Sequence, residues 1–400
     1  MPDFHAFDEL RQELANELVQ DILPYWDALQ DNEFGGFYGR VTGTNECQPH
    51  ADKGCILTAR ILWTFSAAAR ETKNKAYLKG AKQAKDFLLA HFYDKEYGGV
   101  YWKVDYKGNP VDTKKQMYAL GFALYGLSEY FRATQDPEAL QYAIRLFESL
   151  ELHALDTIYG GYVEATTRDW RDLDDVRLSN KDANEKKTMN THLHILEPYT
   201  NLFRVWKDPR LEDAIYKLIC LFLDKIEDPS SHHLGLFFDE EWHIKGTGIS
   251  YGHDIEASWL LLEAARELAA YRPEVYLPLL SKAHVHTRAI AFAGLEGLQP
   301  DGSLIYEIHS SGRVDMSRQW WVQAETVVGL YYLFLYHDVP YTKDMAVKMW
   351  RYIQQHLLDT QHGEWFWSPD NTQDDKAGFW KCPYHNSRMC LELMRDRDIS

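Results

Sequence analysis

Basic residues and cysteines are both scarce in this sequence, and each shortage argues against a class of function. The 400 residues include 43 Lys and Arg against 60 Asp and Glu, a formal net charge of −17 at pH 7. Nucleic acids and anionic membranes bind basic surfaces, so we expect neither as a partner. The five cysteines are scattered, with no Cys-x-x-Cys pair, which argues against a disulfide framework or a zinc ribbon.

Long hydrophobic runs are also missing. The longest apolar stretches, such as residues 327–336, are about ten residues long, whereas a membrane-spanning helix requires about 20. The first ten residues, MPDFHAFDEL, contain acidic side chains where a signal peptide would be basic and then apolar. Together with the cysteine pattern, these features predict a cytoplasmic protein.

Signatures of cofactor and metal chemistry are absent as well. The sequence has no Gly-x-Gly-x-x-Gly before a predicted helix, no P-loop, no Gly-x-Ser-x-Gly elbow and no His-Glu-x-x-His. His192 and His194 form a His-x-His pair, but that ligand spacing suits a strand and not the helix predicted here. We therefore predict a site that uses its own side chains, with no cofactor and no metal.

Aromatic residues, by contrast, are abundant, with 13 Trp, 25 Tyr and 18 Phe. Such rings fill large cores, and their flat apolar faces also suit the stacking of sugars. A Gly-plus-aromatic segment recurs six times, with spacings of 61 to 75 residues. The copies begin at Gly35, Gly98, Gly160, Gly235, Gly302 and Gly363. This near-constant period predicts a repeat architecture in which each copy forms a turn or a short β-like hairpin.

Two helices are predicted between successive copies. The first of each pair is apolar on all sides, as in residues 117–130, which is typical of an inner helix. The second carries more charge, as in residues 76–85, and belongs outside. The N-terminal helix, about residues 7–28, finds its partner in the last helix, about residues 384–396. We predict an all-α fold, an (α/α)6 barrel of six helix pairs with short β-like hairpins at one end, formed by residues 1–400 as a single domain.

Two features of the predicted barrel concern its surroundings. The longest insertion, between Glu164 and Lys187, is rich in charged residues and can form either a loop over one mouth of the barrel or a mobile, solvated loop. The outer helices show no clear apolar stripe. This favours a monomer without determining the oligomeric state.

Polar side chains recur near the starts of the inner helices. Equivalent helix ends cluster in a closed barrel, so we expect these side chains to line one mouth. Asn190 and His194 are four residues apart and His253 and Glu256 are three apart, so each pair shares a helix face. The other members are Arg60, Tyr118, Trp321, Glu325, Trp380 and His385.

Each of these residues also has an ordinary structural explanation. A lone histidine on an apolar face is usually a hydrogen-bonded core residue, and tryptophans usually pack in cores. Glu256 and Glu325 can be capping or surface residues, whereas a buried Arg60 would need a partner. His192 points away from His194 on a helix, so we leave it out of the site. Three histidines at equivalent helix starts favour a functional site over three coincidences.

Histidines without a metal support proton transfer, because imidazole titrates near neutral pH. Two histidines on opposite faces of a carbon next to a carbonyl can take a proton from one face and return one to the other, which inverts that carbon. A reducing sugar has this arrangement at C2 once its ring opens. Arg60 can then stabilise the enediolate oxygen, and Trp321 and Trp380 can stack on the sugar. Glu256 and Glu325 can hold hydroxyl groups or a histidine.

Four segments resemble a known family: MNTHLHILEPYTNL (189–202), GHDIEASWLL (252–261), QWWVQAE (319–325) and FWKCPYHNS (379–387). Over nearly its whole length the sequence resembles the N-acylglucosamine 2-epimerase superfamily, and within it the cellobiose 2-epimerase branch. By position, the resemblance implies that His253 and His385 are the acid/base pair at C2, that His385 also assists ring opening, and that His194 contacts the reacting oxygens. The substrate-binding residues that it implies are Arg60, Tyr118, Asp182, Asn190, Glu256, Trp259, Trp321, Glu325 and Trp380.

The resemblance also implies a reaction that needs neither NAD nor a metal. That reaction inverts C2 of the reducing-end unit of a β-1,4-linked disaccharide, from cellobiose to glucosyl-mannose, through ring opening and a cis-enediolate. Relatives that act on free mannose, as 2-epimerases or aldose–ketose isomerases, share this enediolate, so mannose stays open as a substrate. Two alternatives follow from the fold. One is a glycoside hydrolase that pairs Glu256 with Glu325 or Asp254, and the other is a sugar-binding protein without activity.

Overall fold

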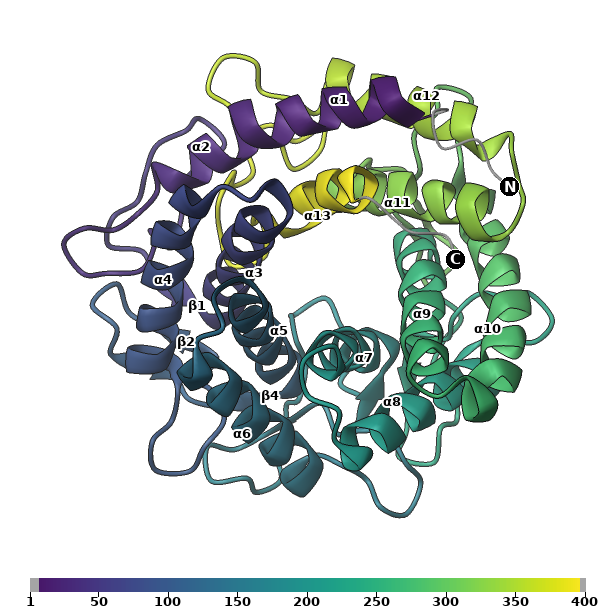
Figure 1. Ribbon diagram of the computed structural model, residues 1–400, viewed down its shortest axis with the longest axis horizontal. Helices are drawn as coiled ribbons and strands as arrows, with labels where there is room; N and C mark the ends of the chain where they lie inside the picture. Colours follow the sequence, from purple (N-terminus) through teal and green to yellow (C-terminus); the bar gives the residue numbers. More distant parts are fainter. Residues whose placement is uncertain (1–6, 396–400) are drawn as a thin grey trace.

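The computed structural model describes residues 7–395, and its helices form two concentric rings around one axis (Figure 1). The first six residues, which are part of the segment used to argue against a signal peptide, lie outside this range. The inner ring consists of α3 (Cys55–Thr72), α5 (Met117–Thr134), α7 (Met189–Phe203), α9 (Tyr251–Tyr271), α11 (Trp320–Tyr336) and α13 (Tyr384–Met394). The predicted (α/α)6 barrel is therefore confirmed.

The outer ring alternates with the inner one along the chain. Its main helices are α1 (Asp8–Glu17), α2 (Leu23–Asp27), α4 (Leu78–Phe87), α6 (Pro137–His153), α8 (Pro209–Leu221), α10 (Pro273–Gly294) and α12 (Thr342–His356). Short π-helical turns follow α1, α4 and α8, namely η2 (Leu18–Ile22), η4 (Leu88–Phe92) and η5 (Phe222–Ile226). A 3-10 turn precedes α4, η3 (Lys75–Tyr77), and another follows α10, η6 (Leu295–Gly297).

Hydrophobic patterning explains which helix lies inside. In α11 every side chain from Trp320 to Leu335 is buried, as expected for a sequence that is apolar on all sides. In α4, by contrast, Ala81 and Ala84 are buried while Lys82 is exposed. The apolar inner helices therefore form the core, and the amphipathic outer helices cover it. None of the described helices is both long and apolar enough to cross a membrane.

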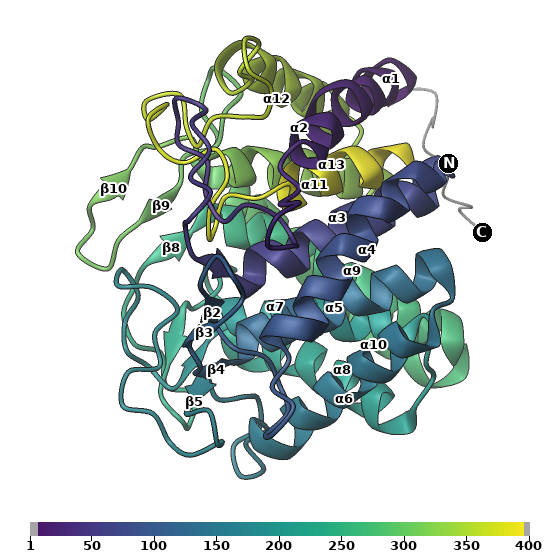
Figure 2. The same cartoon turned by 90° about the vertical axis from the view of Figure 1, so that its left-hand side faces the viewer.

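Short antiparallel strands gather at one end of the barrel, on the left in Figure 2. The pairings are β1 (Lys53–Gly54) with β2 (Lys103–Val104) and β2 with β3 (Pro110–Asp112), β4 (Lys115–Gln116) with β5 (Ala165–Thr166), β6 (Lys187–Thr188) with β7 (Phe237–Phe238), and β9 (Glu307–Ile308) with both β8 (Ile249–Ser250) and β10 (Val314–Asp315). Strands β1, β4, β6 and β8 each end directly before an inner helix. The strand pairs therefore fix where the inner helices begin.

Each Gly-aromatic segment forms a tight turn next to these strands. Gly36 has φ +65°, and a Cβ added there would lie 2.7 Å from the Phe87 ring, so only glycine fits. In the copies at Gly35, Gly98, Gly160 and Gly363, an aspartate four residues before the glycine forms an ion pair with a buried lysine that comes before the next inner helix. These pairs are Lys53–Asp31 at 2.7 Å, Lys115–Asp94 at 2.8 Å, Lys187–Asp156 at 2.6 Å and Lys376–Asp359 at 2.7 Å. We call them the Lys–Asp locks.

The ring closes where α1 packs against α13. Arg11 Nε donates to the carbonyl of Leu393 at 2.9 Å, and Leu14 is fully buried in the same contact region. We call this contact between the two ends of the chain the seam. Glu17 extends it, because its Oε1 accepts from Trp365 Nε1 at 2.7 Å. The first and last described helices therefore complete one ring, as the repeat pattern predicted.

Candidate active site

A cavity of about 360 Å³ lies at the end of the barrel where the inner helices begin. It is lined by His194 from α7, His253 from the first turn of α9 and His385 from the start of α13. Seven other predicted site residues also line it: Arg60, Tyr118, Asp182, Asn190, Glu256, Trp321 and Trp380. The helix starts thus bring together residues up to 325 positions apart in the chain, as His385 and Arg60 are.

Trp259 and Glu325 do not line the cavity but lie behind the residues that do. Both are buried, and Trp259 Nε1 donates to Glu325 Oε2 at 3.1 Å. Each follows a lining residue by three or four positions, as Glu325 follows Trp321, and so lies one turn deeper along its helix. For Glu325 the sequence predicted contact with hydroxyl groups or with a histidine, and in the structure its neighbour is His385.

Two of the histidines are oriented by carboxylates. His385 Nδ1 donates to Glu325 Oε1 at 2.7 Å, and His194 Nδ1 donates to Glu197 Oε2 at 3.0 Å. An ionised carboxylate only accepts hydrogen bonds, so the proton of a neutral His385 ring resides on Nδ1. The Nε2 atom of His385 is then unprotonated and can act as a base.

His253 is oriented by a hydroxyl group instead. Its Nδ1 lies 2.7 Å from Ser250 Oγ, at the start of α9. Burial lowers the pKa of His253 to about 3, and the neighbouring His194 adds to this effect. Burial also lowers the pKa of His385 well below its usual value, helped by the positive charge of Arg60. Both rings are therefore neutral at pH 7, the form that can accept a proton.

Several buried polar atoms around the cavity have no hydrogen-bond partner within residues 7–395. They are Arg60 Nε, Asn190 Oδ1 and Glu256 Oε2. Arg60 is otherwise held by the Tyr118 hydroxyl, which accepts from it at 2.8 Å. Leaving buried polar groups unpaired costs about 1–3 kcal/mol each. A ligand rich in hydroxyl groups would satisfy these atoms, so the cavity is suited to a polar ligand.

Aromatic rings form the walls. The Trp321 ring packs against both His253 and His385, with ring centroids 4.8 and 5.7 Å away. Tyr118 packs against Trp380 at 6.0 Å. Flat apolar surfaces beside hydrogen-bonding groups are the features that bind a sugar ring, whose C–H face is apolar and whose edge is polar.

The charged insertion covers this mouth, so the first of its two predicted arrangements is correct. Residues 178–182 line the cavity, and Asp182 Oδ2 accepts from the backbone N and Oγ of Ser179 at 2.8 Å. A second cavity of about 390 Å³ shares Asp182, Asn190 and His253 with the first. The binding space therefore extends along the loop beyond the three histidines.

His192, which the sequence argument left out, is a core residue. Its Nε2 accepts from the backbone N of Tyr162 at 2.8 Å, and its Nδ1 lies 2.6 Å from the carbonyl of Thr188. Burial lowers its pKa to about 4. Both ring nitrogens are occupied, so His192 has no free atom for chemistry.

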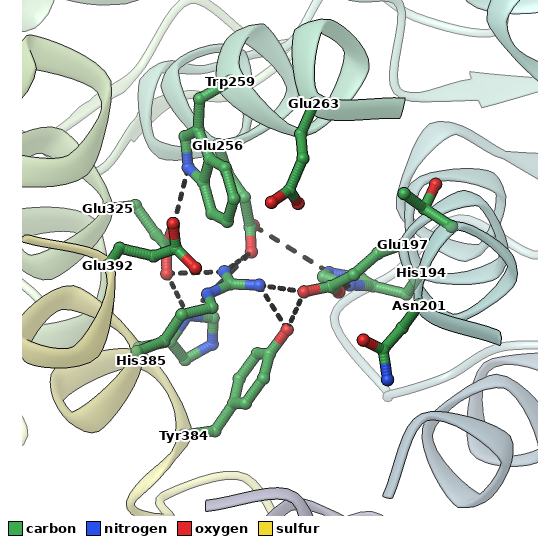
Figure 3. Close-up of polar contacts among 12 residues, drawn as sticks. His194, Glu197, Asn201, Glu256, Trp259, Glu263, Glu325, Tyr384, His385 and Glu392 are labelled. Atoms are coloured by element: carbon green, nitrogen blue, oxygen red, sulfur yellow. Dashed lines mark hydrogen bonds and ion pairs between the residues drawn. The ribbon is translucent and has the colours of Figure 1, made fainter. Parts of the chain in front are cut away.

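Sequence reasoning missed the groups behind the histidines. The closest contacts lie around a buried arginine of α13, Arg388, which donates to Glu197, Glu256 and Glu325, and Figure 3 shows these three carboxylates converging. Arg388 follows His385 by three residues, as Glu197 follows His194, so each shares a helix face with a histidine. That spacing within apolar helices was the available signal.

One group of side chains resembles a metal site but does not fit a cation. Single ligand atoms of Glu256, Glu325 and His385 lie within 4.8 Å of one another. Arg388 donates to Oε1 of both glutamates, and His385 donates to the same Glu325 oxygen. The positive charge that a metal would supply to these oxygens is therefore already supplied by a guanidinium.

With this geometry in view, comparison with known proteins places the chain. Residues 36–387 match the family model described as N-acylglucosamine 2-epimerase (GlcNAc 2-epimerase). The chain is 56% identical over 392 residues to a cellobiose 2-epimerase of Bacteroides fragilis, covering 96% of this chain and 98% of that protein. It is 37% identical over 391 residues to a cellobiose 2-epimerase of Dictyoglomus turgidum, with coverages of 96% and 98%.

Solved structures give the same result. The structure of cellobiose 2-epimerase from Bacillus thermoamylovorans B4167 matches with a TM-score of 0.91 and 41% identity, over 97% of this chain and 99% of that one. A helical barrel whose mouth carries three histidines and a sugar-sized polar cavity is the architecture of a carbohydrate-converting enzyme. The chain belongs to the N-acylglucosamine 2-epimerase family.

Proposed function

We propose that this protein is a carbohydrate 2-epimerase that inverts C2 of the reducing-end unit of a β-1,4-linked disaccharide, converting cellobiose to glucosyl-mannose. The observation that carries the proposal is the pair of neutral histidines, His253 and His385, both packed against Trp321 in a polar cavity. Family membership and the cellobiose 2-epimerase relatives support the choice of reaction and substrate.

The proposed reaction starts with opening of the reducing-end ring, assisted by His385, which exposes an aldehyde at C1. One of His253 and His385 then takes the C2 proton through Nε2, and the electron pair of the broken C–H bond moves into a cis-enediolate. The other histidine has first become an imidazolium, as when His385 takes the proton of the anomeric hydroxyl during ring opening while solvent protonates the ring oxygen, and it returns that proton to the opposite face of C2. One C–H bond breaks and one forms, so no oxidant or reductant is needed.

The remaining residues of the cavity stabilise and hold the sugar. Arg60 places a fixed positive charge next to the enediolate oxygens, where charge develops. His194 contacts the reacting oxygens, and Asn190 and Glu256 bond hydroxyl groups through atoms that lack a protein partner in the described structure. Trp321, Trp380 and Tyr118 supply the stacking faces, and Asp182 lies near the second sugar. Glu325 and Trp259 act from behind, by holding His385.

Two alternatives fit the geometry less well. Hydrolysis with paired carboxylates requires both acids to face the sugar, yet Glu325 lies behind His385 and does not line the cavity. Free mannose would occupy only part of the binding space, which continues past Asp182 into the second cavity. The extended space supports a disaccharide.

Proton exchange in heavy water tests the proposal. The protein, dialysed against EDTA and without NAD, is incubated in D2O with cellobiose and separately with mannose, and the anomeric and C2 signals are followed by NMR. We expect deuterium at C2 together with a glucosyl-mannose product. Turnover of mannose alone would replace cellobiose by mannose as the substrate, with glucose marking an epimerase and fructose an isomerase.

Two other outcomes would contradict the proposed chemistry. Free glucose released from cellobiose without deuterium at C2 would indicate hydrolysis. Binding of cellobiose without any change in it would indicate a sugar-binding protein.

A further inference from the structure

A buried guanidinium lies behind the histidines that line the cavity. Arg388 on α13 is fully buried and does not line the cavity. Its Nη2 donates to Glu256 and, at 2.7 Å, to Glu325, while its Nη1 donates to Glu197 and to the Tyr384 hydroxyl. Figure 3 shows the three carboxylates and Tyr384 directed toward this central position from α7, α9, α11 and α13.

The carboxylates bound by Arg388 are the same ones that contact the histidines. Glu325 accepts from His385 Nδ1 at 2.7 Å, and Glu197 accepts from His194 Nδ1 at 3.0 Å. Arg388 therefore touches the sugar-facing histidines only through their carboxylate partners.

We propose that Arg388 is a positioning residue that keeps Glu325 and Glu197 ionised, so that each holds the Nδ1 proton of its histidine and leaves Nε2 free toward the sugar. The role of Nε2 rests on the proposed function. The charge state of the carboxylates and the position of the ring proton do not depend on the proposed function. Both can be measured in the protein without a sugar.

The physical reason is the cost of gathering three buried negative charges. Without a cation at their centre, Glu197, Glu256 and Glu325 cannot all stay ionised. A protonated Glu325 would donate a hydrogen bond to His385 Nδ1. The proton of the His385 ring would then have to reside on Nε2, the atom that must accept the proton from C2.

The pKa values of the carboxylates show how far Arg388 offsets their burial, since burial raises that of Glu256 to about 7 and Arg388 opposes the rise. Burial alone would raise the pKa of Glu197, but the charge of Arg388 and the hydrogen bond from His194 outweigh it, so its pKa lies below the usual value. Burial raises the pKa of Glu325, and Arg388 opposes that rise. The titratable and charged groups that face this cluster are Arg60 on α3, Tyr118 and Tyr125 on α5, His194 and Glu197 on α7, His253, Glu256 and Glu263 on α9, Glu325 on α11, and Tyr384, His385 and Glu392 on α13 (Figure 3).

Kinetics of Arg388→Met test the proposal. We expect kcat for cellobiose at pH 7 to fall about 10²- to 10⁴-fold, with KM within about twofold, because Arg388 makes no contact with the cavity. Loss of the cation raises the pKa of Glu325, so the acid limb of the kcat profile moves to higher pH and activity partly recovers as pH rises. Arg388→Lys keeps one charge, so its loss should be smaller.

Arg204→Met is the matched control. Arg204 is a mostly buried arginine at the far end of α7, bound to Glu263 at 2.9 Å and Glu267 at 2.8 Å. This variant should lose stability but keep kcat and the shape of the pH profile. An Arg388→Met variant whose activity falls by the same factor at every pH would overturn the proposal.

A measurement on the unmodified protein tests the proposal even if Arg388→Met does not fold. Nitrogen-15 NMR of labelled histidines reports which ring nitrogen carries the proton. We expect His385, assigned by its loss in His385→Asn, to carry it on Nδ1 at pH 7, and to carry it on Nε2 in Arg388→Met. A proton on Nε2 in the unmodified protein would overturn the proposal. Absence of epimerisation with a proton on Nδ1 would instead refute only the proposed function.

Discussion

At the residue scale, the two histidines beside Trp321 differ in what stands behind them. His385 is held by the Glu325 carboxylate at 2.7 Å, whereas His253 faces the Ser250 hydroxyl at 2.7 Å. A carboxylate only accepts a hydrogen bond, but a hydroxyl can rotate to accept or donate. His385 is therefore fixed in one tautomer, while His253 can use either tautomer.

This difference predicts unequal effects of removing the two supporting groups. Glu325→Gln removes the charge that stabilises the His385 imidazolium, so we expect kcat for cellobiose to fall about 10²- to 10³-fold. Ser250→Ala removes only a neutral hydrogen bond, worth about 0.5–1.5 kcal/mol, so the loss should be about tenfold or less. The measurement is the rate of deuterium entry at C2 beside kcat. Equal losses in the two variants would show that the charge on Glu325 is not used.

At the scale of the elements, the Lys–Asp locks join the glycine turns to the starts of inner helices. Asp94 shows how far one lock reaches. It accepts from Lys115, just before α5, and from Arg168 Nε at 2.9 Å at the beginning of the charged insertion. The same carboxylate thus sets the position of α5, which carries Tyr118, and anchors the loop that carries Asp182.

Breaking the Lys115–Asp94 lock should lower the free energy of unfolding much more than breaking an ion pair on the surface. Lys115 and Asp94 are both fully buried, so Lys115→Met leaves a buried carboxylate short of a partner, at a cost of about 3–5 kcal/mol in the free energy of unfolding. The control is Lys82→Met, whose pair with Asp86 is largely exposed and should change stability by less than about 1 kcal/mol. Urea denaturation followed by tryptophan fluorescence measures both. Similar midpoints for the two variants would contradict a structural role for the lock.

Much of this arrangement could be predicted from the sequence, because the repeat and the helical period are local signals. The insertion of charged residues and the histidine spacings also located the mouth of the barrel. Arg388 and Glu197 were not predicted, because their role depends on contacts between α7 and α13. No residue spacing within one helix reveals such contacts. A shared helix face does not say which turn reaches the cavity, so the sequence left open whether Glu325 holds a hydroxyl group or a histidine.

At the scale of the whole molecule, acidic groups collect where the ring closes. Glu17 lies next to Asp21 and near Glu364. Burial raises the pKa of Glu17 to about 8, opposed by the hydrogen bond from Trp365 and reinforced by the charge of Asp21. The folded ring therefore keeps this carboxyl protonated at pH 7, whereas the unfolded chain ionises it near pH 4.5.

The seam should consequently weaken as pH rises. The stabilisation that comes from a protonated Glu17 is complete below about pH 4.5 and is lost as pH rises toward about 8. Glu17→Gln imitates the protonated form, so its melting temperature should exceed that of the unmodified protein by roughly 1–4 °C at pH 8 and by little at pH 5. Glu9→Gln, an exposed position on the same helix, serves as the control. A constant difference across this pH range would show that Glu17 does not titrate in the seam.

The closure of α1 on α13 also has a consequence for the order in which the protein is made. Arg11 and Leu393 are 382 residues apart in the chain, so their contact must wait for almost the whole polypeptide. Contacts of such long range form slowly and carry a large entropy of loop closure. During synthesis α1 cannot complete its contacts with the inner ring until α13 emerges, and α13 brings His385 and Arg388. A ribosome-bound chain that lacks this last helix can hold most of the barrel while the side of the cavity formed by His385 is still missing.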